Sequence, residues 1–264
     1  MENNIILSVR NLMKNFGAIR ALDNVSLNCE KEKIYLVIGP NGSGKTTLIN
    51  CISGLIKPDK GRVFFKGEDI TGKPPHEIVK LGLVRSFQIP MPFYKLTVME
   101  NMLVSTLDNP GEMIRYSLFK KKWSHYEREK IEKAFKILEL LELDHLCDTP
   151  AKDLSGGQLK LLELGRLMML DVDMCLLDEP AGSINPVLAN KIFLHIQRLR
   201  DNYRKTFLII EHRLDIALKY VDYVYAMAEG KIISHGLPEK VVQDPAVLEA
   251  YIAPTKGEKS EHSM

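Results

Sequence analysis

The chain has 264 residues, of which 45% are hydrophobic and 27% are charged, and its formal net charge is +2. This length can bury the core of one large domain, or of one domain with a subdomain. A charge so close to neutral gives no global indication of a nucleic-acid binder, so we expect no nucleic acid among its partners. No uninterrupted apolar run approaches the roughly 18 residues that a membrane-spanning helix needs. We therefore expect a soluble protein that meets a membrane only through a partner.

Short strands with turns between them are predicted for the N-terminal part of the chain. Residues 5–9, 25–27 and 62–65 are rich in β-branched and aromatic side chains, which favour strands. The segment 57–61, with its proline and glycine, is typical of a turn. The four cysteines include no C-x-x-C pair, and we expect Cys51 and Cys175 to be small core residues.

The segment 39–46 carries the most informative pattern in the chain. It matches G-x-x-x-x-G-K-[ST], follows an apolar run at 34–38 that predicts a buried strand, and precedes a helix start at 46–49. Its glycines leave successive backbone N–H groups free to point into one concavity, and the helix dipole adds to their preference for a polyphosphate. A glycine turn that merely ends a strand is the alternative. The predicted nucleotide-binding residues are Gly39, Pro40, Asn41, Gly42, Ser43, Gly44, Lys45, Thr46 and Thr47.

Two further apolar runs, at 174–177 and 206–210, predict parallel strands that are covered on both faces. Polar residues follow each run: Asp178 and Glu179 after the first, and Glu211 and His212 after the second. Ligands bind along the carboxyl ends of parallel strands, so we expect these groups to converge on the glycine segment. Lys45 would then reach the β- and γ-phosphates, and the Thr46 hydroxyl and Asp178 would hold Mg²⁺.

Glu179 is then placed to orient or deprotonate an attacking water. A pair of solvated strand-end carboxylates is the alternative for these two acids.

In the middle of the chain, residues 126–141 predict a helix. Its expected apolar stripe consists of Ile131, Ala134, Phe135, Leu138 and Leu141. Farther along, residues 221–227 and 231–234 predict a β-hairpin, and residues 256–264 predict a disordered tail.

The segment Leu154-Ser155-Gly156-Gly157-Gln158 resembles, residue for residue, the signature motif of the ATP-binding cassette family. An ordinary helix N-cap would explain Ser155, but it would not explain the pair of glycines. The resemblance implies that Ser155, Gly156, Gly157 and Gln158 form a second polyphosphate receptor. In this family two cassettes, identical or different, pack head to tail, so that each signature covers the ATP on the opposite glycine segment.

This resemblance covers the chain from residue 7 to about residue 252. It implies an α/β fold, a P-loop NTPase core of the RecA type with an N-terminal antiparallel β subdomain and an inserted α-helical subdomain. The implied core comprises residues 1–88 and 165–255, the helical subdomain comprises residues 89–164, and the tail comprises residues 256–264. ATP and Mg²⁺ are the implied ligands, and an active ATPase is the implied activity.

The family pattern also assigns roles to residues that carry little meaning alone. Gln88, after a predicted strand at 83–87, matches the glutamine that contacts Mg²⁺ or the water and couples the nucleotide to a membrane partner. His212 matches the histidine that contacts the γ-phosphate, and Phe16 matches the aromatic residue that stacks on adenine. Core packing is the alternative for Phe16. Asn185 departs from the pattern, because many members have aspartate there.

Within the family, the chain is most similar to the ATPases of branched-chain amino acid importers. The segments 84–88, 96–103, 154–166 and 244–252 carry this similarity. It implies two transmembrane permease subunits as partners, an extracytoplasmic solute-binding protein acting through them, and a location on the cytoplasmic face of the membrane. Urea or amide importers and lipopolysaccharide or lipid exporters share much of the pattern. A soluble cassette protein acting on ribosomes or DNA is the rival from another class.

Overall fold

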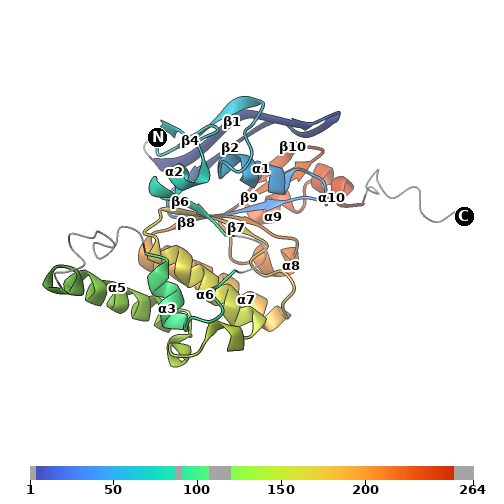
Figure 1. Cartoon of the computed structure of the whole chain (residues 1–264). Helices are drawn as coiled ribbons and strands as arrows, with labels where there is room; N and C mark the ends of the chain where they lie inside the picture. The colour runs from blue at the N-terminus through green and yellow to red at the C-terminus, as the bar shows by residue number, and fades with distance from the viewer. Residues whose placement is uncertain (1–3, 87–90, 107–119, 253–264) are drawn as a thin grey trace, which may run out of the picture.

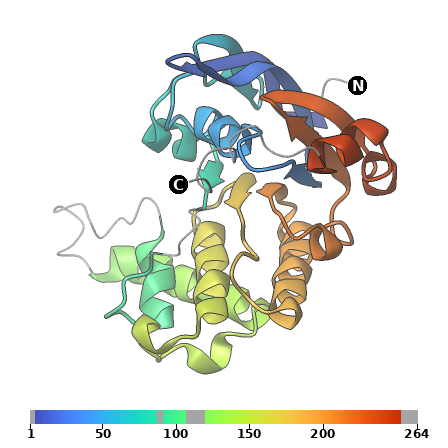
Figure 2. The same cartoon turned by 90° about the vertical axis from the view of Figure 1, so that its right-hand side faces the viewer.

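The computed structural model describes residues 4–86, 91–106 and 120–252. Within them, two sheets are stacked, with α1 between the sheets and α3, α5, α6 and α7 grouped on the far side of the larger one (Figures 1 and 2). The smaller sheet is antiparallel, in the order β2-β1-β4-β5, and the larger has the order β10-β9-β3-β8-β7-β6. This arrangement confirms the predicted α/β fold with an N-terminal antiparallel sheet.

The elements occur along the chain in the following order: β1 (Ile5–Phe16), β2 (Ile19–Glu30), β3 (Ile34–Ile38), α1 (Lys45–Ile52), β4 (Lys60–Phe65), β5 (Glu68–Asp69), α2 (Pro75–Lys80), β6 (Leu83–Arg85), α3 (Val98–Val104), α5 (Lys120–Leu140), α6 (Gly156–Met169), β7 (Met174–Asp178), α7 (Pro186–Tyr203), β8 (Thr206–Ile210), α8 (Leu214–Ala217), β9 (Tyr223–Ala228), β10 (Lys231–Gly236), α9 (Pro238–Val241) and α10 (Pro245–Ile252). Helices α3, α5 and α6 thus lie between β6 and β7 in the sequence.

The three strands that carry chemistry at their ends are fully buried and parallel. All five residues of β3, β7 and β8 are buried. Strand β8 lies between the other two, and its Phe207 is paired with Ile34 of β3 and Cys175 of β7. The carboxyl ends of the three strands therefore lie along one edge of the sheet, which confirms the predicted convergence.

The core is divided by the larger sheet into two clusters of apolar side chains. In β3, Tyr35 and Val37 pack on the side of α1 and the antiparallel sheet, whereas Leu36 and Ile38 pack on the side of α3, α5, α6 and α7. Both faces of the sheet are thus covered, which explains why its strands are uninterrupted apolar runs. Cys51 and Cys175 are buried within this core, as predicted.

Two predictions from periodicity differ from the structure. Strands β1 and β2 have twelve residues each, longer than the predicted 5–9 and 25–27. Their ladder has register shifts, including one between Val9 and Leu12, and a shift of this kind interrupts the alternation that sequence reasoning uses. In α5, Ile131 and Phe135 are 40% and 42% exposed, so their assignment to the buried stripe is wrong.

The buried face of α5 is narrower than the predicted stripe. Ala134, Ile137 and Leu138 are buried there, and Leu141 is buried just beyond the helix end. The helix packs against α3 and α6, so side chains at the margins of the stripe stay open to solvent. The hairpin is confirmed as the antiparallel pair β9 and β10. The predicted tail at 256–264 lies outside the described residues.

Candidate functional site

The glycine segment forms a loop between β3 and α1 whose shape requires its glycines. Gly39, Gly42 and Gly44 have φ values of 149°, 77° and 101°, which favour glycine. A Cβ on Gly39 would lie 2.2 Å from the Met227 carbonyl oxygen, and one on Gly44 would lie 2.4 Å from the Ala21 carbonyl oxygen. Gly44 is the N-cap of α1 and supplies no side-chain cap. The first N–H groups of α1 can therefore serve an anionic ligand.

Lys45 lies against its own loop. Its side chain is buried, and Nζ donates hydrogen bonds to the carbonyl oxygens of Gly39 at 2.7 Å and Pro40 at 2.9 Å. Burial lowers the pKa of Lys45, and the carboxylates of Glu179 and Asp178 oppose that shift. The ammonium group is thus held within the glycine loop. Thr46 is exposed at the start of α1, where a ligand can reach its hydroxyl.

Asp178 lies at the end of β7 and is paired with an arginine that sequence reasoning missed. Arg85 Nη2 lies 2.9 Å from Asp178 Oδ2, and the two side chains are 10% and 6% exposed. Arg85 Nη1 also donates to Asn50 of α1, and the Asp178 N–H donates to Ser86 Oγ at 3.3 Å. Arg85 thus joins the loop helix, the acidic strand and the strand before Gln88. Arg85 lies at the end of β6, the strand next to β7, and this position could have indicated its contact with Asp178.

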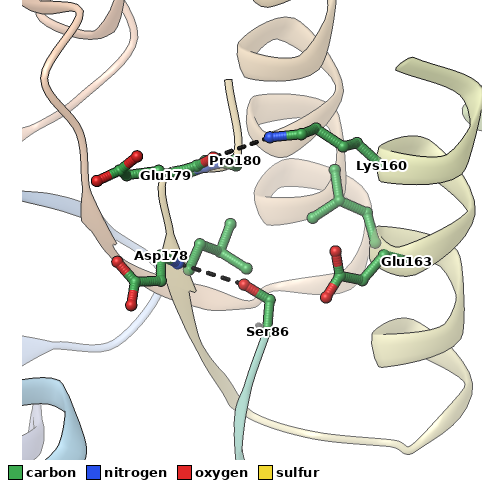
Figure 3. A pocket seen from close by; sticks show the side chains of 8 residues that line it. Ser86, Lys160, Glu163, Asp178, Glu179 and Pro180 are labelled. Atoms are coloured by element: carbon green, nitrogen blue, oxygen red, sulfur yellow. Dashed lines mark hydrogen bonds between the residues drawn. The ribbon is translucent and has the colours of Figure 1, made fainter. Parts of the chain in front are cut away.

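Glu179 and His212 are brought together, as predicted. Glu179 Oε1 lies 3.1 Å from His212 Nε2, and the side chains are 26% and 39% exposed, which leaves them open to solvent. Figure 3 shows the carboxylates of Asp178 and Glu179 on the same side of the end of β7, and Lys160 and Glu163 of α6 on the other side. Glu179 and His212 are therefore placed to act on a ligand that approaches from the side of the two carboxylates.

The signature segment begins α6, and its two glycines have different surroundings. The Ser155 N–H donates to Gln158 Oε1 at 2.8 Å, and the Gln158 N–H donates to Ser155 Oγ at 3.4 Å, which forms a capping box. A Cβ on Gly157 would lie 1.9 Å from Leu188 Cδ2, whereas one on Gly156 would meet nothing within 4 Å. Packing within the chain therefore explains Gly157 but not the exposed Gly156.

The remaining predicted residues are placed as follows. Phe16 is 47% exposed at the end of β1, with Lys14 Nζ 5.6 Å from its ring centroid, so the alternative of core packing is wrong. Asn185 caps α7 by accepting a hydrogen bond from the Leu188 N–H at 2.9 Å, a role that its amide oxygen shares with aspartate. Gln88 lies outside the described residues.

A second residue that sequence reasoning missed reaches the glycine loop from the C-terminal helix. The Gly39 N–H donates to Tyr251 Oη at 2.8 Å. Burial raises the pKa of Tyr251, so this phenol stays neutral over the physiological range. Tyr251 belongs to the C-terminal segment 244–252, and no local pattern there indicates its contact with a residue so distant in the chain.

Comparisons with known proteins agree with this geometry. A profile of the family described as ABC transporter matches residues 22–182. A probable branched-chain amino acid transport ATP-binding protein LivG from Archaeoglobus fulgidus is 51% identical, with 94% of this chain and 95% of that protein covered. The high-affinity branched-chain amino acid transport ATP-binding protein LivG of Escherichia coli K12 is 33% identical, with coverages of 94% and 97%.

A crystal structure of the ADP conformation of an ATP-binding cassette of an ABC transporter is also similar. It has a TM-score of 0.82 and 49% sequence identity, and 94% of this chain and 99% of that chain are covered. In the part of the chain that the structure describes, no helix combines the length and the apolarity that crossing a bilayer demands. The chain therefore belongs to the ABC transporter family and is one of its ATP-binding, ATP-hydrolysing cassettes.

Proposed function

We propose that this cassette drives an importer of branched-chain amino acids through separate transmembrane subunits. The observation that carries the proposal is the identity of 51% with a protein named for this transport, over 94% of the chain. That span reaches far beyond the nucleotide-binding motifs, so it includes the surfaces by which importers of different kinds must differ. The partners that we propose are two permease subunits, a solute-binding protein acting through them, and a second cassette. The cassette would lie on the cytoplasmic face of the membrane.

Hydrolysis of ATP would use positioned groups rather than a covalent intermediate. Transfer of the γ-phosphoryl group to water needs alignment and charge stabilisation. The loop amides and Lys45 would bind the phosphates, Phe16 would stack on adenine, and Glu179 would orient the water. His212, 3.1 Å from Glu179, would contact the γ-phosphate.

Mg²⁺ fits the donors that the site offers. Among the described residues, no group of three or more histidine, cysteine or acidic side chains could hold a metal by itself. Mg²⁺ characteristically takes one or two protein oxygens together with substrate phosphates, and the exposed Thr46 hydroxyl and the Asp178 carboxylate are donors of that kind. We propose that Thr46, Asp178 and Gln88 hold the ion. When bound, it would neutralise charge on the β- and γ-phosphates.

A second cassette is proposed because of Gly156. This glycine is exposed, and a side chain would meet no atom of its own chain. Close approach of another molecule to the backbone is a physical reason for glycine at such a position. An ATP held by the glycine loop of a second cassette, identical or different, would approach Gly156 in this way and would lie at the N-terminus of α6, which favours anions.

The role of Glu179 is tested by replacement with glutamine in the full-length chain. We expect Glu179→Gln to lose nearly all turnover and to keep ATP affinity, because the amide preserves shape but cannot act as a base. Glu30→Gln is the matched control, since Glu30 pairs with Lys33 on the surface. Steady-state hydrolysis and equilibrium binding of ATP measure the two effects. Hydrolysis by Glu179→Gln at the unsubstituted rate would falsify the assignment.

The transport role is tested by what the cassette binds in membranes. We expect it to copurify with two polytopic subunits. In the reconstituted complex, leucine, isoleucine or valine with the binding protein should stimulate ATP hydrolysis. Stimulation by urea or an amide would reassign the solute, and stimulation by a lipid or lipopolysaccharide would reassign the direction. Sedimentation with ribosomes would contradict the proposal altogether.

A further inference from the structure

Glu179 has a backbone conformation that its surroundings must hold in place. Its φ is 50°, in the left-handed region that residues with a Cβ seldom adopt. Such a conformation persists where neighbouring groups determine it, and it is found frequently at functional sites. The Glu179 N–H donates to the Ile210 carbonyl oxygen at 2.9 Å, which continues the ladder between β7 and β8. On the other side of Glu179, its carbonyl oxygen accepts a hydrogen bond from the Gly182 N–H at 3.0 Å, and two charged groups from distant segments also hold the main chain there.

The first of these groups is Lys160 of α6. Its Nζ donates a hydrogen bond to the carbonyl oxygen of Glu179 at 3.0 Å, as Figure 3 shows. Burial lowers the pKa of Lys160, and the carboxylates of Glu211, Glu163 and Glu179 oppose that shift. Lys160 follows Ser155 on the same helix by five residues. The helix that starts with the signature segment therefore holds the main chain of Glu179 directly.

The second group is Glu211, which follows β8 and is 1% exposed. Its Oε1 accepts a hydrogen bond from the Ala181 N–H at 2.7 Å, and its Oε2 accepts from the His212 N–H at 3.0 Å and the Arg213 N–H at 3.3 Å. A buried carboxylate needs such donors, and these come from both sides of the site. Glu211 thus joins the segment after Glu179 to the segment that carries His212.

We propose that Lys160 and Glu211 are positioning residues that keep the carboxylate of Glu179 beside His212. The proposal rests on the proposed function of Glu179. Without Lys160, the Glu179 carbonyl oxygen keeps only the Gly182 N–H as a donor, and Glu179 can relax to the extended conformation that is favoured before a proline, which turns its side chain away from His212. Without the Glu211 carboxylate, the N–H groups of Ala181 and His212 lose the acceptor that they share.

The proposal is tested in the full-length chain with Lys160→Met, Lys160→Arg and Glu211→Gln. We expect Lys160→Met and Glu211→Gln each to lower kcat about tenfold to a hundredfold, the range that loss of a hydrogen bond with one charged partner can produce. The dissociation constant for ATP should change by about twofold or less, because neither residue lies in the glycine loop. Lys160→Arg should recover most of the lost kcat, since it keeps a cationic donor.

Asp222→Asn is the matched control for a role in folding alone. Asp222 accepts a hydrogen bond from the Ile34 N–H at 2.7 Å and pairs with Arg200 at 3.0 Å, at the opposite end of β3 from the glycine loop. We expect this variant to unfold at a lower urea concentration and to keep kcat. If Glu211→Gln does not fold, the comparison of Lys160→Met with Lys160→Arg decides the proposal.

The outcomes separate this proposal from the one on which it rests. Normal turnover by Glu179→Gln would refute the role of Glu179 itself. An inactive Glu179→Gln together with normal turnover by Lys160→Met would refute the positioning role. Equal loss of kcat in Lys160→Met and Lys160→Arg would also refute it, because a donated hydrogen bond would then not be the cause.

Discussion

Replacing the two glycines at the start of α6 by alanine, one at a time, separates packing within the chain from contact with a second cassette. In a helix, alanine is more favourable than glycine by up to about 1 kcal/mol. At Gly157 the new Cβ would lie 1.9 Å from Leu188 Cδ2 and 2.8 Å from Leu188 Cγ, so Leu188 must move. Overpacking of this kind costs about 1–3 kcal/mol. With about 1 kcal/mol of helix propensity set against this cost, we expect Gly157→Ala to be destabilised by up to about 2 kcal/mol.

Gly156→Ala should behave in the opposite way in the nucleotide-free protein. The new Cβ would meet no atom within 4 Å, so the free energy of unfolding should stay the same or rise by a few tenths of a kcal/mol. If the backbone at Gly156 faces the ATP of a second cassette, however, the methyl group occupies that approach. We then expect ATP hydrolysis to fall at least about tenfold, the effect of losing about 1.4 kcal/mol of transition-state stabilisation.

Urea unfolding without nucleotide measures the first effect for both variants. Steady-state hydrolysis and sedimentation velocity with and without ATP measure the second. A Gly156→Ala protein that hydrolyses ATP and associates in its presence as the unsubstituted chain does would refute the argument that Gly156 faces a second cassette. A Gly157→Ala protein of unchanged stability would show that Leu188 gives way without cost.

Three further perturbations test the site and its support. Lys45→Ala should lose affinity for ATP by at least about tenfold in equilibrium binding, because the loop loses its ammonium group; unchanged affinity would contradict the assigned phosphate site. Tyr251→Phe removes the acceptor for the Gly39 N–H and should weaken ATP binding about threefold to tenfold, with faster hydrogen exchange at Gly39 as the structural readout. Burial lowers the pKa of His195, so the unfolded chain binds that proton more readily, and the stability that depends on neutral His195 should be lost as the pH falls through its unfolded value of about 6.5. His195→Gln should lose less stability than the unsubstituted chain between about pH 7 and pH 5 in urea titrations, and equal losses would rule out this contribution.

The agreement between prediction and structure differs from element to element for physical reasons. The strands at 34–38 and 206–210 were predicted with the bounds that the structure shows, because strands buried on both faces are short apolar runs that end where polar residues begin. The predictions for β1 and β2 were too short, because bulges break the alternation. The apolar stripe predicted for α5 was wider than its buried face, because α3 and α6, which pack against α5, determine how much of the helix is covered.

Local patterns predicted most of the candidate site, because its residues lie in short segments of consecutive residues. A glycine loop before a helix, two acids after an apolar strand and a serine before a pair of glycines each have a local physical meaning. Their convergence followed from strand order alone. Gly157 shows the limit of this reasoning, since its glycine is explained by Leu188, which is about thirty residues away and has no pattern in common with it.

The sequence alone therefore indicates the glycine loop, the acidic strand end, the histidine after β8 and the family, because each depends on residues that are neighbours in the chain. It does not indicate Arg85 beside Asp178, Lys160 and Glu211 around Glu179, or Tyr251 on Gly39. Each of these contacts joins segments that are far apart in the sequence, and a charged or phenolic side chain has the same local signature whether it faces solvent or holds the main chain of the site. Folding decides between the two, by bringing α6, β8 and α10 against the ends of β3 and β7.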